Sequence, residues 1–199
     1  MAKNDFAQIT TPAGEAVYPK LRSTEVFDGE DTGKYVCGIK LSKADTDKLI
    51  QRIENEWEMA KKSPDFDGKR YGRNSAPALG FHEDKDGDIV FKAKTNAVIK
   101  TKAGEVIEKT MAVFDKKGKP MDEDMEVGNG STIRLCMLLR PFYASATVYG
   151  IQLLLKAVQV LNYVAPAAGA VSADDCGFDV EEEFDEDNPP FATSEGADF

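Results

Sequence analysis

The fold is decided by two stretches of sequence, TIRLCMLLRPF at Thr132–Phe142 and GIQLLLKAVQVLNYV at Gly150–Val164. Both are rich in aliphatic and β-branched residues, which predicts two long strands. Upstream, KYVCGIKL at Lys34–Leu41 is β-branched and aromatic and predicts another strand. FKAKTNAVIKTK at Phe91–Lys102 predicts a further strand that carries lysines. The body of the protein is therefore expected to consist mostly of β-structure.

Turn signals separate these strands. Glu15–Leu21 alternates loosely and is interrupted by Pro19, so it is expected to be an edge strand, because proline cannot donate to a ladder. Tight turns are predicted where glycine follows a small or polar residue. They lie at Asp86-Gly87, Ala103-Gly104, DKKGKP at 115–120 and GNGS at 128–131.

One helix is predicted after the Lys34–Leu41 strand. Ser42 with Asp45 three residues later resembles a capping box, and Ser63-Pro64 ends the segment. Between them an apolar stripe at four-residue spacing faces the core. Its members are Leu49, Ile53, Trp57 and Ala60. Many strands with one helix favour a five-stranded OB-fold barrel with additional strands, and a β-sandwich is the alternative.

Composition limits the setting in which the protein works. The three cysteines, Cys37, Cys136 and Cys176, are scattered, and His82 is the only histidine. This pattern argues against disulfides, a zinc site or another cofactor and favours a reducing compartment. No run of residues is long and apolar enough to span a bilayer, and the N-terminus lacks the apolar stretch of a signal peptide. We therefore expect a cytoplasmic protein.

The charge is distributed unevenly along the chain. Residues 171–199 hold eleven of the 35 acidic residues and no lysine or arginine, so the net charge of −10 becomes +1 without them. This composition predicts an OB-fold domain at 1–170 followed by a disordered acidic tail at 171–199. Phenylalanines are spaced among the acidic residues of the tail, a composition typical of a peptide that binds basic, apolar pockets. We therefore expect Phe191, Asp198 and Phe199 to bind partner proteins. A purely solubilising tail is the alternative.

Enzyme signatures are absent from the sequence. There is no phosphate-binding Gly-x-x-x-x-Gly-Lys loop, and the single His82 leaves a serine or cysteine nucleophile without an obvious base. Asp84, Asp86 and Asp88 resemble the start of a calcium loop, but the twelfth position is Thr95 instead of glutamate. The sequence therefore predicts a protein that is not an enzyme and needs no metal.

Cations interleaved with aromatic residues are the remaining signal. Single-stranded nucleic acid is held by a positive groove along its phosphates and by rings on which its bases stack. Three stretches have this composition, and Arg134 adds a cation on the first long strand. The candidate DNA-binding residues are Lys69, Arg70, Tyr71, Arg73, Phe91, Lys92, Lys94, Lys100, Lys102, Arg134, Arg140, Phe142, Tyr143 and Tyr149. Phe142 and Tyr143 are adjacent on a strand and point to opposite faces, so only one of them is expected to stack on a base.

The order of these motifs resembles the single-stranded DNA-binding proteins of podovirus-type phages. It runs from Phe91 through the two long strands to Val164, with MAKNDF at the start and Asp198-Phe199 at the end. The resemblance implies an OB fold, coating of single-stranded DNA and strand annealing in phage replication and recombination. It also implies that the tail contacts the phage DNA polymerase and helicase-primase, and it is compatible with a homodimer.

The same resemblance implies a role for one ring. In that family an aromatic residue after the proline of the long strand stacks on DNA, and this position is Phe142. The chain differs from the family pattern in its shorter tail, in Ala144 and in the additional Tyr143. Two other hypotheses remain: a DNA-mimicking adaptor or inhibitor that does not bind nucleic acid, and an RNA-binding module similar to cold-shock domains.

Overall fold

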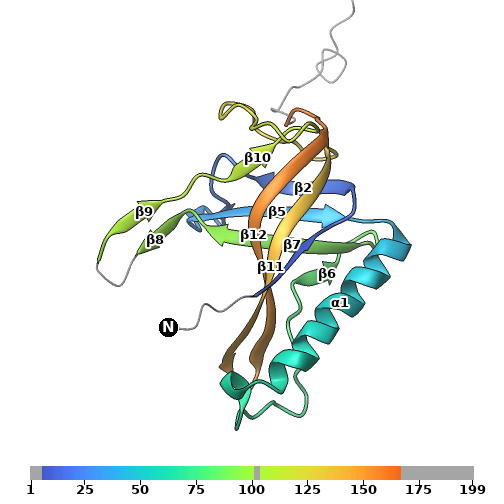
Figure 1. The fold of residues 1–199 in the computed structure, drawn as a ribbon, viewed down its shortest axis with the longest axis vertical. Helices are drawn as coiled ribbons and strands as arrows, with labels where there is room; N and C mark the ends of the chain where they lie inside the picture. Colours follow the sequence, from blue (N-terminus) through green and yellow to red (C-terminus); the bar gives the residue numbers. More distant parts are fainter. Residues whose placement is uncertain (1–5, 101–103, 167–199) are drawn as a thin grey trace, which may run out of the picture. The chain divides into compact units, whose positions relative to one another are not determined.

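The protein's structure, a computed structural model, describes residues 6–100 and 104–166. The predictions for the acidic segment 171–199 lie outside the described residues. In chain order the elements are β1 (Ala7–Thr10), β2 (Gly14–Lys20), β3 (Val26–Phe27), β4 (Glu30–Asp31), β5 (Lys34–Lys40), α1 (Lys43–Lys61), the 3-10 helix η1 (Pro64–Phe66), β6 (Phe81–Glu83), β7 (Ile89–Asn96), β8 (Val98–Lys100), β9 (Val106–Glu108), β10 (Ala112–Phe114), β11 (Thr132–Ser145) and β12 (Val148–Asn162) (Figure 1).

Five strands close into a ring. Each is hydrogen-bonded to the next in the order β2, β5, β7, β12, β11 and back to β2. Only the β7–β12 pair within this ring is parallel. β1, β6 and β10 extend it by pairing with β11, β7 and β12. A closed ring of five strands is the architecture of an OB barrel, so the predicted fold class is confirmed and the β-sandwich alternative is wrong.

The β11–β12 hairpin supplies much of the core. On β11 every second side chain points inward, but on β12 this alternation shifts by one residue at Lys156. There Met137 pairs with Leu155 while Cys136 pairs with Ala157, so Lys156 is the extra residue of a bulge. The shift keeps both apolar sets inside the barrel. The buried side chains are Ile133, Leu135, Met137 and Leu139 on β11 and Ile151, Leu153, Leu155, Val158 and Val160 on β12.

Helix α1 forms where the sequence predicts it. The Ser42 hydroxyl accepts a hydrogen bond from the Asp45 backbone N–H at 3.3 Å and donates one to the Asp45 carboxylate at 2.8 Å. The predicted stripe from Leu49 to Ala60 is buried, and its Trp57 ring stacks on Tyr149 of β12. Helix α1 is therefore fixed to the hairpin by its apolar face. Among the described residues, no helix has the length and apolar character that crossing a bilayer requires.

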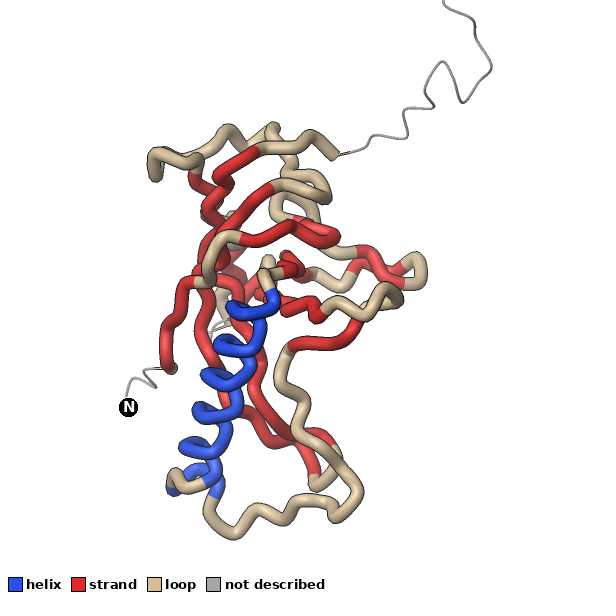
Figure 2. The backbone as a smooth tube through the Cα atoms, turned by 90° about the vertical axis from the view of Figure 1, so that its right-hand side faces the viewer, coloured by secondary structure: helices blue, strands red, loops and turns tan. Residues whose placement is uncertain are grey.

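The loop that follows α1 and η1 returns along the same hairpin, as Figure 2 shows. We call residues 67–80 the strap. The Ala78 N–H donates to the Tyr149 carbonyl, and the Ala78 carbonyl accepts from the Ile151 N–H, both at 2.8 Å. These bonds attach the strap to β12 as a short additional bridge. The Gly72 N–H, next to the basic residues of the strap, donates to the Ala146 carbonyl in the turn of the hairpin, at 2.8 Å.

Two predicted strands differ from the structure. Phe91–Lys102 is not one strand, because β7 ends at Asn96 and β8 begins at Val98. Pairing changes partner at Ala97: its N–H donates to the Gly33 carbonyl at 2.9 Å, in register with β5–β7, and its carbonyl accepts from the Lys109 N–H at 2.7 Å, in register with β8–β9. The predicted edge strand at Glu15–Leu21 corresponds to β2, which lies within the ring. Its Pro19 is tolerated because the β2–β5 register shifts between Val17 and Lys20.

Candidate nucleic-acid interface

An aromatic cluster joins α1, the strap and the β11–β12 hairpin. Trp57 lies near its centre: its ring is edge-on to Phe66 and Tyr71, with centroids 5.7 and 5.9 Å away, and stacks on Tyr149 at 5.6 Å. Tyr71 is also edge-on to Tyr149 at 4.8 Å and to Tyr143 at 5.9 Å. Such pairs stabilise a core beyond the area they bury. The five rings therefore hold the strap against the hairpin.

Tyr143 belongs to this cluster. Its ring is stacked on Tyr149 with centroids 6.4 Å apart, and its hydroxyl donates to the Arg70 carbonyl at 2.8 Å. The Lys69 ammonium lies 5.1 Å from the Tyr143 ring centroid, in cation–π geometry. Burial raises the pKa of the neighbouring Tyr71 hydroxyl. Tyr143 and Tyr71 therefore serve the packing of the strap, and their rings are occupied by neighbouring side chains.

Phe142 points to the other face of β11 and is half-buried. No ring–ring contact involves Phe142 in the part of the chain that the structure describes. Its side chain lines two hollows of about 470 and 620 Å³. We call them the strand-side groove, which contains Lys92 and Lys94 of β7, and the helix-side groove, which contains Lys69 and Arg140.

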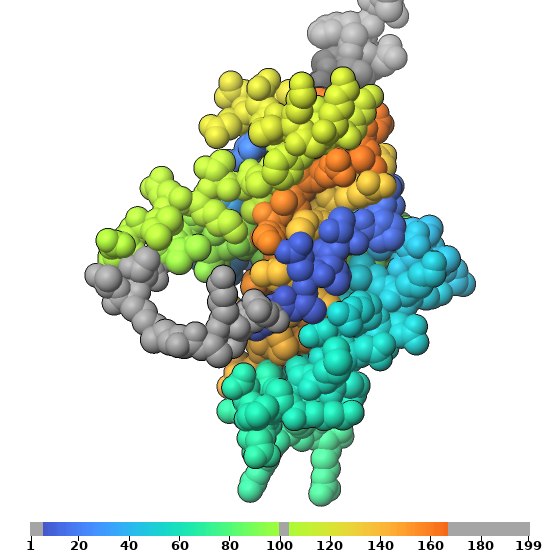
Figure 3. Space-filling view, in the orientation of Figure 1, coloured from blue at the N-terminus to red at the C-terminus, as the bar shows by residue number. Residues whose placement is uncertain are grey.

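The two grooves each contain cations and share one aromatic ring, that of Phe142. The helix-side groove lies between the C-terminal half of α1 and the end of β11, and it also contains the carboxylates of Glu56 and Asp65. In the space-filling view, α1 and the residues that follow it form the lower end of the body beside the hairpin (Figure 3). A ring flanked by ammonium and guanidinium groups is the arrangement that binds stacked bases and their phosphates.

Other predicted site residues lie elsewhere. Phe91 is fully buried and packs on Phe81, with centroids 5.6 Å apart, and Tyr149 is only 4% exposed. Both rings belong to the core, which corrects their assignment to a DNA-binding surface: Phe91 shares the inward face of β7 with Ala93. Arg134 is exposed but lines a separate hollow beside β10, away from the residues that line the two grooves.

The remaining predicted cations are Arg70, Arg73, Lys100 and Lys102. Arg70 and Arg73 are exposed on the strap. No ion pair of either guanidinium appears among the described residues. Lys100 is the last residue of β8, and Lys102 lies outside the described residues. The structure thus brings together Lys69, Lys92, Lys94, Arg140 and Phe142 and leaves the other members of the predicted set apart from them.

A third hollow, the barrel cleft, lies over the outer faces of β2, β5 and β7. It has a volume of about 370 Å³ and is lined by Lys40, Lys92 and His82 among others. In OB folds the second and third barrel strands form the ligand-binding face, and these are β5 and β7 here. The barrel cleft is therefore a second candidate surface, and it shares Lys92 and His82 with the strand-side groove.

Tyr18 is a candidate that the sequence analysis did not single out. It lines the barrel cleft, is 76% exposed and has φ of 45°, a conformation that is unusual for a residue with a large side chain. Its backbone N–H donates to the Asn129 side-chain oxygen at 2.6 Å, which supports this conformation. The only signal in the sequence is the Tyr18-Pro19 pair that interrupts a strand.

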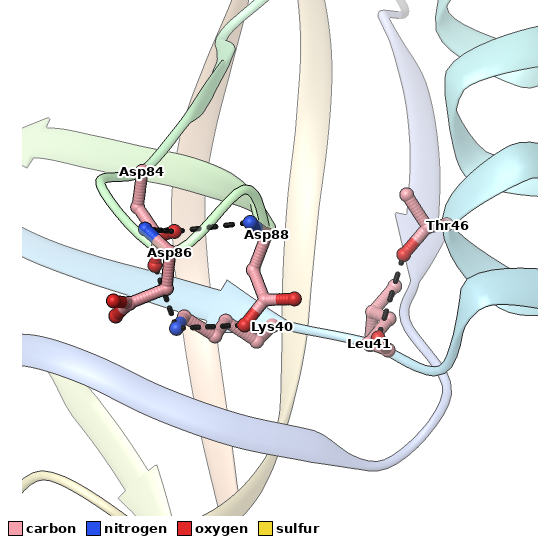
Figure 4. A network of polar contacts seen from close by, with 6 residues as sticks. All are labelled: Lys40, Leu41, Thr46, Asp84, Asp86 and Asp88. Carbon is pink, nitrogen blue, oxygen red and sulfur yellow. Dashed lines mark hydrogen bonds and ion pairs between the residues drawn. The ribbon is translucent and has the colours of Figure 1, made fainter.

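The acidic turn before β7 binds a lysine side chain. The Lys40 ammonium lies 2.6 Å from an Asp84 carboxylate oxygen and 3.1 Å from one of Asp88 (Figure 4). Asp84 also accepts from the backbone N–H groups of Asp86 and Asp88, at 2.9 and 3.0 Å. The bond to Lys40 is the main cause that lowers the pKa of Asp84 to about 2. These carboxylates therefore stabilise the turn and attach it to β5.

Comparisons with known proteins agree with the fold. A protein-family model described as single-stranded DNA-binding protein, bacteriophage T7, matches residues 19–163. The crystal structure of gp2.5, a single-stranded DNA-binding protein encoded by bacteriophage T7, has a TM-score of 0.62 and 21% sequence identity, covering 86% of this chain and 99% of that one. The single-stranded DNA-binding protein of bacteriophage Enc34 in complex with ssDNA has a TM-score of 0.58 and 15% identity, covering 81% of this chain and 89% of that one. A search of curated protein sequences gave no match.

Proposed function

Because this chain belongs to the single-stranded DNA-binding protein family of bacteriophage T7, we propose that it coats single-stranded DNA during phage replication, recombination and strand annealing. The observation that supports this proposal best is that Phe142 lines both cationic grooves. The proposed role is binding alone, without catalysis or a cofactor. The protein would act in the cytoplasm of the bacterial host, where phage DNA is copied.

The proposed interface combines stacking with phosphate contacts. A base stacks on Phe142 while Lys92 and Lys94 on one side and Lys69 and Arg140 on the other contact phosphates. Phosphate contacts carry no sequence information, so binding is expected to be largely independent of sequence. The body has a net charge of only +1 without the residues of 171–199. Its attraction for DNA is therefore local to the grooves and strongly dependent on salt.

A titration of labelled single-stranded DNA, single-stranded RNA and duplex DNA tests the proposal. We expect tighter binding to single-stranded DNA than to duplex, because bases in a duplex are already stacked and do not expose a face to Phe142. Affinity is expected to fall as salt rises from 50 to 200 mM, with a slope of about −0.7 in log–log form for each phosphate contact. Equal affinity for RNA would favour the RNA-binding module, and absence of binding would favour the DNA-mimicking adaptor.

The acidic segment 171–199 is the second part of the proposal. We propose a DNA-binding body at 1–170 and a tail that recruits the phage DNA polymerase and helicase-primase. The support is compositional: eleven carboxylates are spaced with phenylalanines, and Asp198 stands next to Phe199. Carboxylates beside aromatic rings suit a basic, apolar pocket on a partner protein. The same negative charge would compete with DNA for the cations of the body.

Deleting residues 172–199 is expected to strengthen DNA binding at low salt and abolish partner recruitment. Competition by the tail is electrostatic, so the gain in affinity should shrink as the Debye length falls to about 8 Å at physiological ionic strength. Phe199→Ala is the matched variant, because it keeps every side-chain carboxylate and removes only the terminal ring. It should impair polymerase pull-down and leave DNA affinity almost unchanged. Undiminished pull-down after deletion would contradict the recruiting role.

A further inference from the structure

Lys92 makes an ion pair with Glu25. Its ammonium lies 2.6 Å from a Glu25 carboxylate oxygen, and the Lys92 and Glu25 side chains are 44% and 23% exposed. Glu25 immediately precedes β3, so it approaches Lys92 from a segment 67 residues away in the chain. An ammonium–carboxylate contact at this distance is a charge-assisted hydrogen bond. In the free protein the exposed cation of β7 therefore already has an anionic partner.

The position of Lys92 makes this pair relevant to DNA. Lys92 is shared by the strand-side groove, which contains Phe142, and the barrel cleft, which contains Glu25. Lys94 lies on the same outer face of β7 two residues further along, and no ion pair of its side chain appears among the described residues. A strand of nucleic acid that stacks on Phe142 and follows these two lysines thus reaches the Glu25 carboxylate at Lys92.

We propose that the Glu25 carboxylate occupies the position of a DNA phosphate in the free protein and that bound single-stranded DNA displaces it from Lys92. This inference rests on the proposed function. Carboxylate and phosphate oxygens accept the same kind of hydrogen bond from an ammonium group. One anion therefore substitutes for the other without any change in the lysine. Glu25 lowers the affinity for DNA at this position and keeps Lys92 paired until DNA arrives.

The backbone around Glu25 permits this exchange without unfolding. The Glu25 N–H donates to the Lys34 carbonyl and the Glu25 carbonyl accepts from the Thr32 N–H, both at 2.8 Å. These bonds fix the base of the β3–β4 hairpin, so displacement requires only rotation of the Glu25 side chain. Ion pairs of this exposure are weak. The carboxylate is therefore easily displaced, and its effect on affinity is expected to be a few-fold.

Glu25→Gln tests the proposal in the full-length protein. The substitution keeps the shape of the side chain and removes its charge, so Lys92 is free for a phosphate. We expect affinity for single-stranded DNA at low salt to rise about two- to fivefold. The slope of log affinity against log salt should become steeper, because the competing Glu25–Lys92 ion pair of the unmodified protein is itself weakened as salt rises.

Glu30→Gln is the matched control. Glu30 lies on β4 of the same hairpin and is exposed, and no ion pair of its carboxylate appears among the described residues. The Glu30→Gln substitution removes the same charge from the same hairpin, so it measures the general effect of one negative charge on DNA affinity. The proposal is overturned if Glu25→Gln leaves affinity and salt slope unchanged, or if Glu30→Gln has the same effect. Absence of DNA binding by the unmodified protein would instead reject the proposed function and this inference together.

Discussion

Phe142→Ala is expected to weaken binding to single-stranded DNA by about 1–3 kcal/mol, the range for loss of one base–aromatic stack. Phe142 is half-buried and makes no ring–ring contact among the described residues, so its removal leaves the aromatic cluster intact. The loss should therefore appear in affinity and not in folding. Fluorescence titration of a labelled oligonucleotide measures the first, and urea unfolding measures the second.

Tyr143→Phe is the control for this substitution. It keeps the neighbouring ring in the cluster and removes only the hydroxyl that donates to the Arg70 carbonyl. We expect a small loss of stability, on the order of 1 kcal/mol, and almost no change in DNA affinity. If Phe142→Ala binds DNA as tightly as the unmodified protein while remaining folded, the DNA path does not cross β11. The barrel cleft with its exposed Tyr18 would then be the better candidate.

The fold could be predicted largely because its main elements have strong local patterns. The apolar stripe of α1 and the aliphatic runs of β11 and β12 identify their elements from sequence alone. β1 and the β3–β4 hairpin were not predicted, because strands of four and two residues are too short to show a periodic pattern. β1 depends in addition on a partner that is distant in the sequence, β11, whereas β3 and β4 pair with each other.

The site was harder to predict than the fold, because the direction of each side chain depends on long-range packing. The local sequence does not distinguish the adjacent rings of Phe142 and Tyr143 as candidates for stacking on a base. Only the contact of Tyr143 with the strap, 73 residues away, shows that its side chain is already packed. Phe91 shares its face with the buried Ala93, so the period of the strand favours the core for this ring. The pairing of Lys92 with Glu25 has no signal in the local sequence at all.

Gly150→Ala is expected to have the largest effect on stability. Gly150 has φ of 145°, and a Cβ at this position would lie 2.0 Å from the Ala78 carbonyl oxygen. The backbone of Ala78 is bonded to both neighbours of this glycine, Tyr149 and Ile151. Alanine would therefore add backbone strain of about 1–3 kcal/mol and break two hydrogen bonds of about 1 kcal/mol each. A total loss of about 3–5 kcal/mol is expected in the free energy of unfolding, measured with urea.

Gly118→Ala is the control that measures the cost of backbone strain without a close contact such as that between Gly150 and Ala78. Gly118 also has positive φ, 78°, but no atom lies within 4 Å of a Cβ built there. Its substitution should destabilise by only about 1–2 kcal/mol and leave DNA binding unchanged. Gly150→Ala should also weaken DNA binding, because Gly150 lies opposite Phe142 in the hairpin and the displaced strap carries Lys69. If the two variants lose equal stability, the strap does not depend on its contact with β12, and its cations are not held in place by Gly150.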